Sequence, residues 1–166
     1  MVIRVIKYKD AENFLKLKYQ LDNESKFLLL EPGERKTTLN EQIENIKNIL
    51  SMDNSVIFVV ENNNKLIGYL SAIGGKYKRN EHVVNVVIAI LNEFTGQGIG
   101  KMLFAELEKW AVYHNIHRLE LTTMTHNFNA LTLYKKMGFQ IEGERIESLY
   151  IDGKYINEYY LYKLII

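Results

Sequence analysis

Cysteine is absent from the 166-residue chain and proline occurs only once, and these absences exclude several kinds of protein. Without cysteine the chain can form no disulfide, no thiolate nucleophile and no zinc–thiolate site. The four histidines show no spacing typical of metal ligands, so we expect no bound metal. No repeat, low-complexity tract or linker interrupts the sequence, which predicts one domain over residues 1–166.

An excess of positive charge and long apolar runs are missing as well. The formal net charge is +1, which gives no indication of nucleic acid or an anionic membrane as a partner. No apolar run approaches the ~20 residues that a membrane span needs. Arg4, Lys7 and Lys9 interrupt the apolar residues near the N-terminus, so we expect no signal peptide there. These observations favour a cytoplasmic enzyme or binding protein.

Enough apolar sequence remains to build a core, since 47% of the residues are hydrophobic and 25% are charged. The patterns predict strands at 2–6, 56–60, 66–73, 83–91, 119–124, 141–151 and 155–164, and helices at 10–22, 38–51, 99–115 and 127–137. This order predicts an α/β fold with a single mixed, mostly antiparallel central sheet and helices on both faces. We expect strand 83–91 to be covered on both faces. The irregular segment 23–37 should fold over the core or over a substrate.

Local signals mark several of the element boundaries. Asp10 can cap the first helix, and Thr38 with Glu41 forms the capping box of the second. Residues 62–64, which are three asparagines, and the pair 152–153, Asp-Gly, are typical of hairpin turns. Two antiparallel hairpins are therefore predicted.

Three glycines at alternate positions, Gly96, Gly98 and Gly100, separate strand 83–91 from a helical pattern that begins near Ile99. Glycine permits positive φ angles and close approach of a ligand to the backbone. The start of a helix adds unpaired amides and the positive end of the helix dipole. This arrangement predicts a phosphate-binding site and a phosphorylated cofactor.

Other interpretations of the glycine loop remain at this point. A Walker loop requires a hydroxyl residue after its lysine, but Met102 follows Lys101. A Rossmann turn requires a third glycine where Lys101 stands, although Glu120 lies about where a ribose-binding acid falls. The loop could also be a glycine-rich turn without a ligand, so a second motif is needed to decide.

Residues 127–139 predict a short helix with a defined start and end. Asn127 can cap its first turn, Gly138 suits the left-handed position after its last turn, and Phe139 can pack back against it. Four residues should share one face at helical spacing: Ala130, Leu133, Tyr134 and Met137. Taken alone, this is an ordinary amphipathic helix in which Tyr134 is a core aromatic.

In this order and spacing, the two motifs resemble those of the GCN5-related N-acetyltransferase (GNAT) superfamily. The second family signature, Asn-x-x-Ala-x-x-Leu-Tyr-x-x-x-Gly-Phe, is complete from Asn127 through Phe139. The first, Gln/Arg-x-x-Gly-x-Gly/Ala, is matched at Gly98 and Gly100 but has Thr95 at its first position. This departure should cost at most one side-chain contact, because backbone amides hold most of the pyrophosphate. The predicted order of elements is also that of the GNAT fold.

The resemblance implies acetyl-CoA as co-substrate. In the family, the pantetheine arm runs beside the strand before the glycine loop, and the pyrophosphate sits on the amides of the loop. The cofactor-binding residues expected on this basis are Ile88, Ala89, Ile90, Leu91, Thr95, Gly96, Gln97, Gly98, Ile99, Gly100, Lys101, Asn127, Ala130 and Tyr134.

The resemblance also implies direct transfer of the acetyl group to an amine within a ternary complex. Tyr134 is expected to be the general acid that protonates the departing thiolate. Many family members deprotonate the amine with a carboxylate near the start of the fourth strand, where Glu81 and His82 stand in this chain. A solvated strand end explains these two residues equally well.

The resemblance implies that the acceptor is a primary amine of a small molecule or a peptide N-terminus, and no residue pattern narrows this class further. A non-catalytic acyl-CoA-binding or sensing module on the same fold is the alternative, and the intact Tyr134 and Asn127 favour the enzyme. The tyrosine-rich C-terminal hairpin offers a sheet edge and apolar surface. A homodimer and a monomer are both compatible with it.

Overall fold

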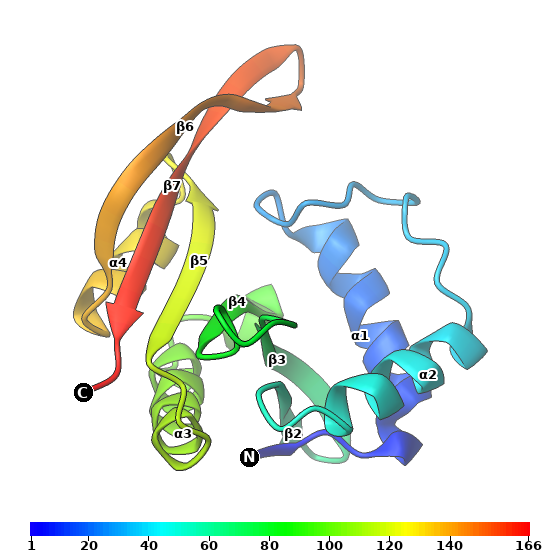
Figure 1. The fold of residues 1–166 in the computed structure, drawn as a ribbon. Helices are drawn as coiled ribbons and strands as arrows, with labels where there is room; N and C mark the ends of the chain where they lie inside the picture. The colour runs from blue at the N-terminus through cyan, green and yellow to red at the C-terminus, as the bar shows by residue number, and fades with distance from the viewer.

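Seven strands form one sheet in the computed structural model, which describes residues 1–166 (Figure 1). The strand order is β1-β2-β3-β4-β5-β7-β6, and every neighbouring pair is antiparallel except β4 and β5. The strands are β1 (Val2–Val5), β2 (Val56–Asn62), β3 (Lys65–Gly74), β4 (Val83–Ile90), β5 (Arg118–Met124), β6 (Gln140–Ile151) and β7 (Lys154–Leu164). The predicted mixed, mostly antiparallel sheet is therefore confirmed.

Four α-helices cover the sheet in the predicted order. They are α1 (Ala11–Glu24), α2 (Leu39–Leu50), α3 (Ile99–Tyr113) and α4 (Phe128–Lys136), and two 3-10 turns, η1 (Tyr8–Asp10) and η2 (Asn92–Phe94), lie between elements. Helices α1 and α2 pack over β2 and β3 on one face, and α3 lies against β3 and β4 on the other. None of the helices combines the length and the apolar character needed to cross a bilayer.

Strands β4 and β5 pair along three residues only and then separate. Their paired residues run from Val83–Arg118 to Asn85–Glu120. Beyond this pairing, β4 continues to Ile90 and β5 continues to Met124. The carboxyl-terminal half of β4 therefore has a strand partner on its β3 side only. This leaves a gap inside the sheet, and we call the gap between β4 and β5 beyond the last rung the β4–β5 opening.

One face of β4 is left open to solvent near the last rung. The expectation that strand 83–91 is covered on both faces is wrong for Asn85 and Val87, which are both exposed. The reason is the placement of α1 and α2, which pack over β2 and β3 and do not extend across β4 and β5. The opposite face carries Val84 and Val86, which are buried.

Both predicted hairpins are confirmed, and their turns have the expected backbone. Asn63 and Asn64 have φ angles of 49° and 62°, and Asp152 and Gly153 have φ angles of 49° and 76°. Two successive residues at positive φ give the turn whose twist matches that of antiparallel strands. Asparagine, aspartate and glycine tolerate this region better than other residues, which is why the sequence predicted both turns.

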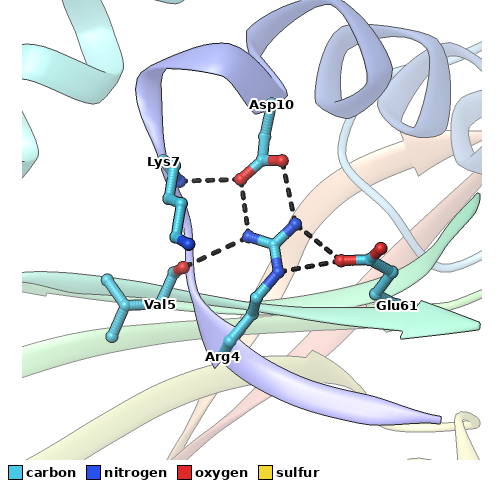
Figure 2. A network of polar contacts seen from close by, with 5 residues as sticks. All are labelled: Arg4, Val5, Lys7, Asp10 and Glu61. Carbon is cyan, nitrogen blue, oxygen red and sulfur yellow. Dashed lines mark hydrogen bonds and ion pairs between the residues drawn. The ribbon is translucent and has the colours of Figure 1, made fainter. Parts of the chain in front are cut away.

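The first helix begins differently from its prediction. The Asp10 side chain does not cap α1; it is buried and makes two hydrogen bonds with the Arg4 guanidinium, of 2.7 and 2.9 Å. It also accepts a 2.7 Å hydrogen bond from the amide of Lys7, while Arg4 Nε donates to Glu61 (Figure 2). The network connects β1 to β2 and to the turn before α1, so Asp10 stabilises the edge of the sheet.

We expect Asp10→Asn to lower the free energy of unfolding at pH 7 by about 1–3 kcal/mol, because it removes charge-assisted hydrogen bonds to Arg4. The Arg4 guanidinium lowers the pKa of Asp10 below its ordinary value of 3.8. A lowered pKa in the folded state contributes stability above the unfolded pKa that is lost as the pH falls through the folded pKa. Urea unfolding of both proteins at pH 7 and pH 3 should show the difference shrinking at pH 3. An equal difference at the two pH values would contradict this role.

Candidate active site

The glycine loop between β4 and α3 exposes backbone amides at the mouth of a helix. Gly96 and Gly98 have φ angles of 76° and 81°, and Gly98 is the N-cap of α3. Apart from the glycine itself and its two chain neighbours, no protein atom lies within 4 Å of a Cβ placed on either glycine. Gly96, Gln97 and Gly98 are exposed, and Lys101 in the first turn of α3 is exposed as well. The loop therefore presents unpaired amides and a positive helix end to open space, which suits a phosphate.

Two residues of the loop have additional roles that the sequence did not predict. A Cβ on Gly100 would lie 2.6 Å from Cδ2 of Leu133 in α4, so Gly100 is needed for close contact between α3 and α4. The Thr95 hydroxyl donates to the carbonyl of Asn92 at 2.8 Å and closes the η2 turn. Thr95 thus stabilises the turn that leads into the loop, and its hydroxyl already donates to a protein acceptor.

Helix α4 has both of its predicted ends. The Asn127 side chain accepts a hydrogen bond from the amide of Ala130 at 3.4 Å. At the other end Gly138 has a φ of 86° and its amide donates to the carbonyl of Lys135, while the amide of Phe139 donates to Tyr134, both at 3.0 Å. These two bonds define a Schellman end, which fixes the position of the last turn of α4.

The ring of Tyr134 is fixed by packing while its hydroxyl makes no hydrogen bond to the protein. The residue is 7% exposed, and its ring meets those of Phe104 and Phe139 at centroid distances of 5.9 and 6.0 Å. No fully enclosed side-chain oxygen or nitrogen lacks a partner, so the unbonded hydroxyl is open to a ligand or to water. Burial raises the pKa of Tyr134 to about 12, so the hydroxyl is a proton donor at neutral pH.

The backbone of β4 turns some of its hydrogen-bonding groups toward the β4–β5 opening. The carbonyl of Val83 and the amide of Leu91 hydrogen-bond toward β3, at the two ends of the β3–β4 pairing. Because peptide groups alternate in direction along an antiparallel strand, the odd-numbered residues face β3. The backbone N–H and C=O groups of Ile88 and Ile90 therefore point toward the opening, beyond the last rung with β5. Those of Ala89 point toward β3.

The glycine loop, the start of α4 and the β4–β5 opening lie at one end of the parallel pair. Since β4 and β5 run in the same direction, the segments that follow them emerge at the same edge. The glycine loop follows β4, and Asn127 follows β5. An extended ligand can therefore lie in the opening with its charged end on the loop and its other end toward the last rung, Asn85–Glu120.

Glu81 and His82 lie at the opposite end of β4. The carbonyl of His82 accepts hydrogen bonds from the amides of His117 and Arg118, at the start of β5. The paired rungs of β4 and β5 separate this end of β4 from the β4–β5 opening. From His82 to Ile88 an extended strand spans about 20 Å. The structure thus brings Tyr134, Asn127 and the loop to one end, and it does not bring Glu81 and His82 there.

A cavity of about 230 Å³ adjoins the last rung on the open face of the sheet. Its lining includes Asn85 from β4, Glu120 from β5, and Glu142 and Tyr160 from the C-terminal hairpin. Arg118 pairs with both carboxylates, and Glu120 remains 39% exposed. No local pattern predicts Glu120 at this position, because only the strand register places it opposite Asn85.

The segment between α1 and α2 begins above the β4–β5 opening. Glu24 accepts two 3.3 Å hydrogen bonds from Asn92, just after β4, and the Phe27 ring lies 5.4 Å from that of His126, just after β5. The last residue of α1 and the segment that follows it therefore contact the two sides of the opening. Leu28 packs against the core, whereas Leu29 is 77% exposed, so only part of this apolar segment folds over the core as predicted.

Comparison with known proteins identifies the family. Residues 18–139 match the model of the Acetyltransferase (GNAT) family, and the chain belongs to that family. The L-amino acid N-acetyltransferase AaaT of Escherichia coli (strain K12) is 29% identical over 97 residues, which cover 58% of this chain and 60% of that protein. The Spermidine N(1)-acetyltransferase of Vibrio cholerae serotype O1 is 32% identical over 100 residues, which cover 59% and 57%. The chain thus matches less than two thirds of the length of these relatives.

Solved structures show the same fold over the whole chain. An acetyltransferase of the GNAT family from Streptococcus pneumoniae has a TM-score of 0.96 and 31% identity, with 99% of both chains covered. A GNAT superfamily phosphinothricin acetyltransferase from Sinorhizobium meliloti, solved in complex with AcCoA, has a TM-score of 0.85 and 16% identity over 99% of this chain and 88% of that one. The predicted GNAT fold is confirmed.

Proposed function

We propose that the protein transfers the acetyl group of acetyl-CoA to a primary amine of a small molecule or peptide. One observation carries the proposal: β4 and β5 separate after Asn85–Glu120, at the end where the glycine loop and α4 begin. Such an opening offers backbone groups to an extended arm and a helix mouth to its diphosphate. Membership of the acetyltransferase family and the AcCoA complex of a structural relative support the same assignment.

The chain's own groups fit acetyl-CoA along its length. The amides from Gly96 to Lys101 would hold the diphosphate, with open space above Gly98. The free peptide groups of Ile88 and Ile90 would bond the pantetheine arm as an added strand does. When bound, the co-substrate supplies an activated thioester. The protein then contributes alignment, which removes roughly 7–11 kcal/mol of the barrier in well-oriented reactions.

Tyr134 is proposed to protonate the departing sulfur. Its hydroxyl is free of protein partners, its ring is fixed by Phe104 and Phe139, and its raised pKa keeps the proton available. A fixed donor at a developing negative charge typically contributes 10²–10³ in rate, roughly 3–4 kcal/mol. The neutral phenol also avoids placing a charge in the buried position before reaction.

The amine must lose a proton before it attacks, and Glu120 is better placed to take it than Glu81 or His82. Glu120 stands on the last rung before the β4–β5 opening and lines the cavity on the open face. It reaches the opening from the open face, while Tyr134 lies with α3 and α4 on the other face. Acid and base would therefore act from opposite sides of the reacting carbonyl.

We expect Glu120→Gln to lower kcat about 100-fold at pH 7, within the range of a removed general base. The loss should shrink at pH 9 to 10, because the acceptor amine then needs no base. Glu142 continues to pair with Arg118 in the variant. Initial rates of thiol release across this pH range measure the effect, and Glu81→Gln is the matched control. A larger loss in Glu81→Gln than in Glu120→Gln would contradict the assignment.

An acceptor screen tests the proposed function itself. Purified protein is incubated with acetyl-CoA and a panel of amino acids, peptides and polyamines. The names of two relatives include an L-amino acid and spermidine, a polyamine. Release of free thiol together with an acetyl mass shift in one amine is the expected result. Tight binding of acetyl-CoA without thiol release for any amine would instead support the non-catalytic module.

A further inference from the structure

A second cavity, of about 310 Å³, lies on the same face of the sheet under α1 and α2. Its floor includes Val87 of β4, the residue before Ile88, and Ile73 of β3, which pairs with Asn85. The cavity therefore adjoins the last rung before the β4–β5 opening. Its walls combine apolar side chains with a lysine and three side-chain amides, namely Lys18, Gln42, Asn45 and Asn48.

The polar groups in the cavity wall have hydrogen-bond donors to spare. Lys18 Nζ donates to Oε1 of Gln42 at 3.1 Å, and no other acceptor in the protein bonds it. Because an ammonium group can only donate, the Gln42 oxygen must face Lys18, which turns the Gln42 NH₂ group away from it. That NH₂ group bonds no protein atom although Gln42 is 1% exposed, and it is not fully enclosed, so it opens onto the cavity.

The charges around the cavity are positive in balance. No carboxylate lines it. The carboxylate whose charge acts on Lys18 is that of Asp22, which makes a two-point ion pair with Arg35 at 2.6 and 2.9 Å. Burial lowers the pKa of Lys18 to about 8, so its ammonium group is charged at neutral pH but poorly solvated. A polycationic ligand would be repelled here, and an anionic acceptor of hydrogen bonds would be attracted.

We propose that Lys18 and Gln42 bind the carboxylate of the acceptor, and that the acceptor is an amino acid with an apolar side chain. The proposal rests on the proposed acetyltransferase function and specifies its substrate class. The two spare donors of Lys18 and the NH₂ group of Gln42 match the two oxygens of a carboxylate. The apolar residues of the same cavity, including Phe14, Ile73 and Val87, match an apolar side chain. With its carboxylate on Lys18 and Gln42, such a ligand would direct its α-amine toward Val87 and the adjoining β4–β5 opening.

The test compares free amino acids with their amides as acetyl acceptors. L-Valine, L-leucine and L-phenylalanine are each paired with the corresponding amide, and spermidine serves as the polycation. We expect kcat/KM of the wild type to favour the acid of each pair by about 10- to 100-fold, because hydrogen bonds to a charged group change affinity by about this factor. Amidation lowers the pKa of the neighbouring amine and so favours the amide intrinsically. Equal or better use of the amides, or a preference for spermidine, overturns the proposal.

Two variants identify the groups responsible. Lys18→Met should lower kcat/KM for the acids by about 10- to 100-fold and bring the acid-to-amide ratio close to one. Gln42→Glu, which keeps the shape and pairs with Lys18, should do the same. Lys16→Met is the matched control, because Lys16 lies on the same helix, is exposed and pairs with Glu12; its ratio should equal that of the wild type. A wild-type ratio in both folded variants overturns the proposal.

A binding measurement separates this proposal from the proposed function. If no amine is acetylated, calorimetry with L-leucine and L-leucinamide on the CoA-saturated protein replaces the kinetic assay. Binding of the acid alone, lost in Lys18→Met, supports the carboxylate site although catalysis has failed. Equal binding of both compounds, or no binding of L-leucine to the wild type, overturns it.

Discussion

Tyr134→Phe is expected to lower the turnover number by about 100- to 1,000-fold while the affinity for acetyl-CoA stays within about twofold. The substitution removes only the hydroxyl, which bonds no protein atom, and it leaves the ring contacts with Phe104 and Phe139 in place. The loss should therefore appear in kcat and not in stability. Single-turnover rates and calorimetry of acetyl-CoA binding measure the two quantities separately.

A matched variant shows whether loss of any tyrosine hydroxyl would have this effect. Tyr8 lies in η1 at the far edge of the sheet and is 55% exposed, so Tyr8→Phe should behave as the wild type. If Tyr134→Phe turns over at the wild-type rate, Tyr134 is a packing residue only. If its melting temperature falls together with its activity, a structural role accounts for the loss.

Gly98→Val is expected to weaken acetyl-CoA binding at least 100-fold. The residue has a φ of 81°, and a side chain there points into space that no protein atom occupies within 4 Å. In the proposed complex the diphosphate takes this space, so a branched side chain would exclude it from the amides of the helix mouth. Titration calorimetry with acetyl-CoA measures the loss directly.

Gly153→Val provides the control for backbone strain. Gly153 has a φ of 76° and equally open surroundings, but it lies in the turn between β6 and β7. Both variants place a β-branched residue in the left-handed region, at a cost of roughly 1–2 kcal/mol in stability. Only Gly98→Val should lose affinity for acetyl-CoA. Equal affinities in the two variants would show that the glycine loop is a turn without a ligand.

The sequence predicted those features that depend on neighbouring residues. The asparagine and Asp-Gly turns, the Thr38 capping box and the Schellman end at Gly138 were all confirmed, since each requires only a few consecutive residues to adopt one backbone shape. The order of elements then followed from their periodicity. Asp10 was the exception, because its partner Arg4 comes from another element and competes with the cap.

Features that depend on register could not be predicted in the same way. Glu120 stands opposite Asn85 only because β4 and β5 pair as they do, and their sequences are separated by all of α3. Lys18 donates to the side-chain oxygen of Gln42 from a different helix, so this pair too depends on how α1 and α2 pack. Gly100 was assigned to phosphate binding by its motif, while its contact with Leu133 requires the packing of α3 on α4. Contacts between distant segments leave no local pattern in a single sequence.

A crystal structure of the protein with coenzyme A would show directly whether the glycine loop holds the diphosphate. We expect diphosphate oxygens within hydrogen-bond distance, roughly 2.7–3.2 Å, of amide nitrogens between Gly96 and Lys101. We also expect the pantetheine arm in the β4–β5 opening, bonded to the peptide groups of Ile88 and Ile90. A nucleotide bound elsewhere, with those amides facing only water, would show that the glycine loop is not the phosphate site.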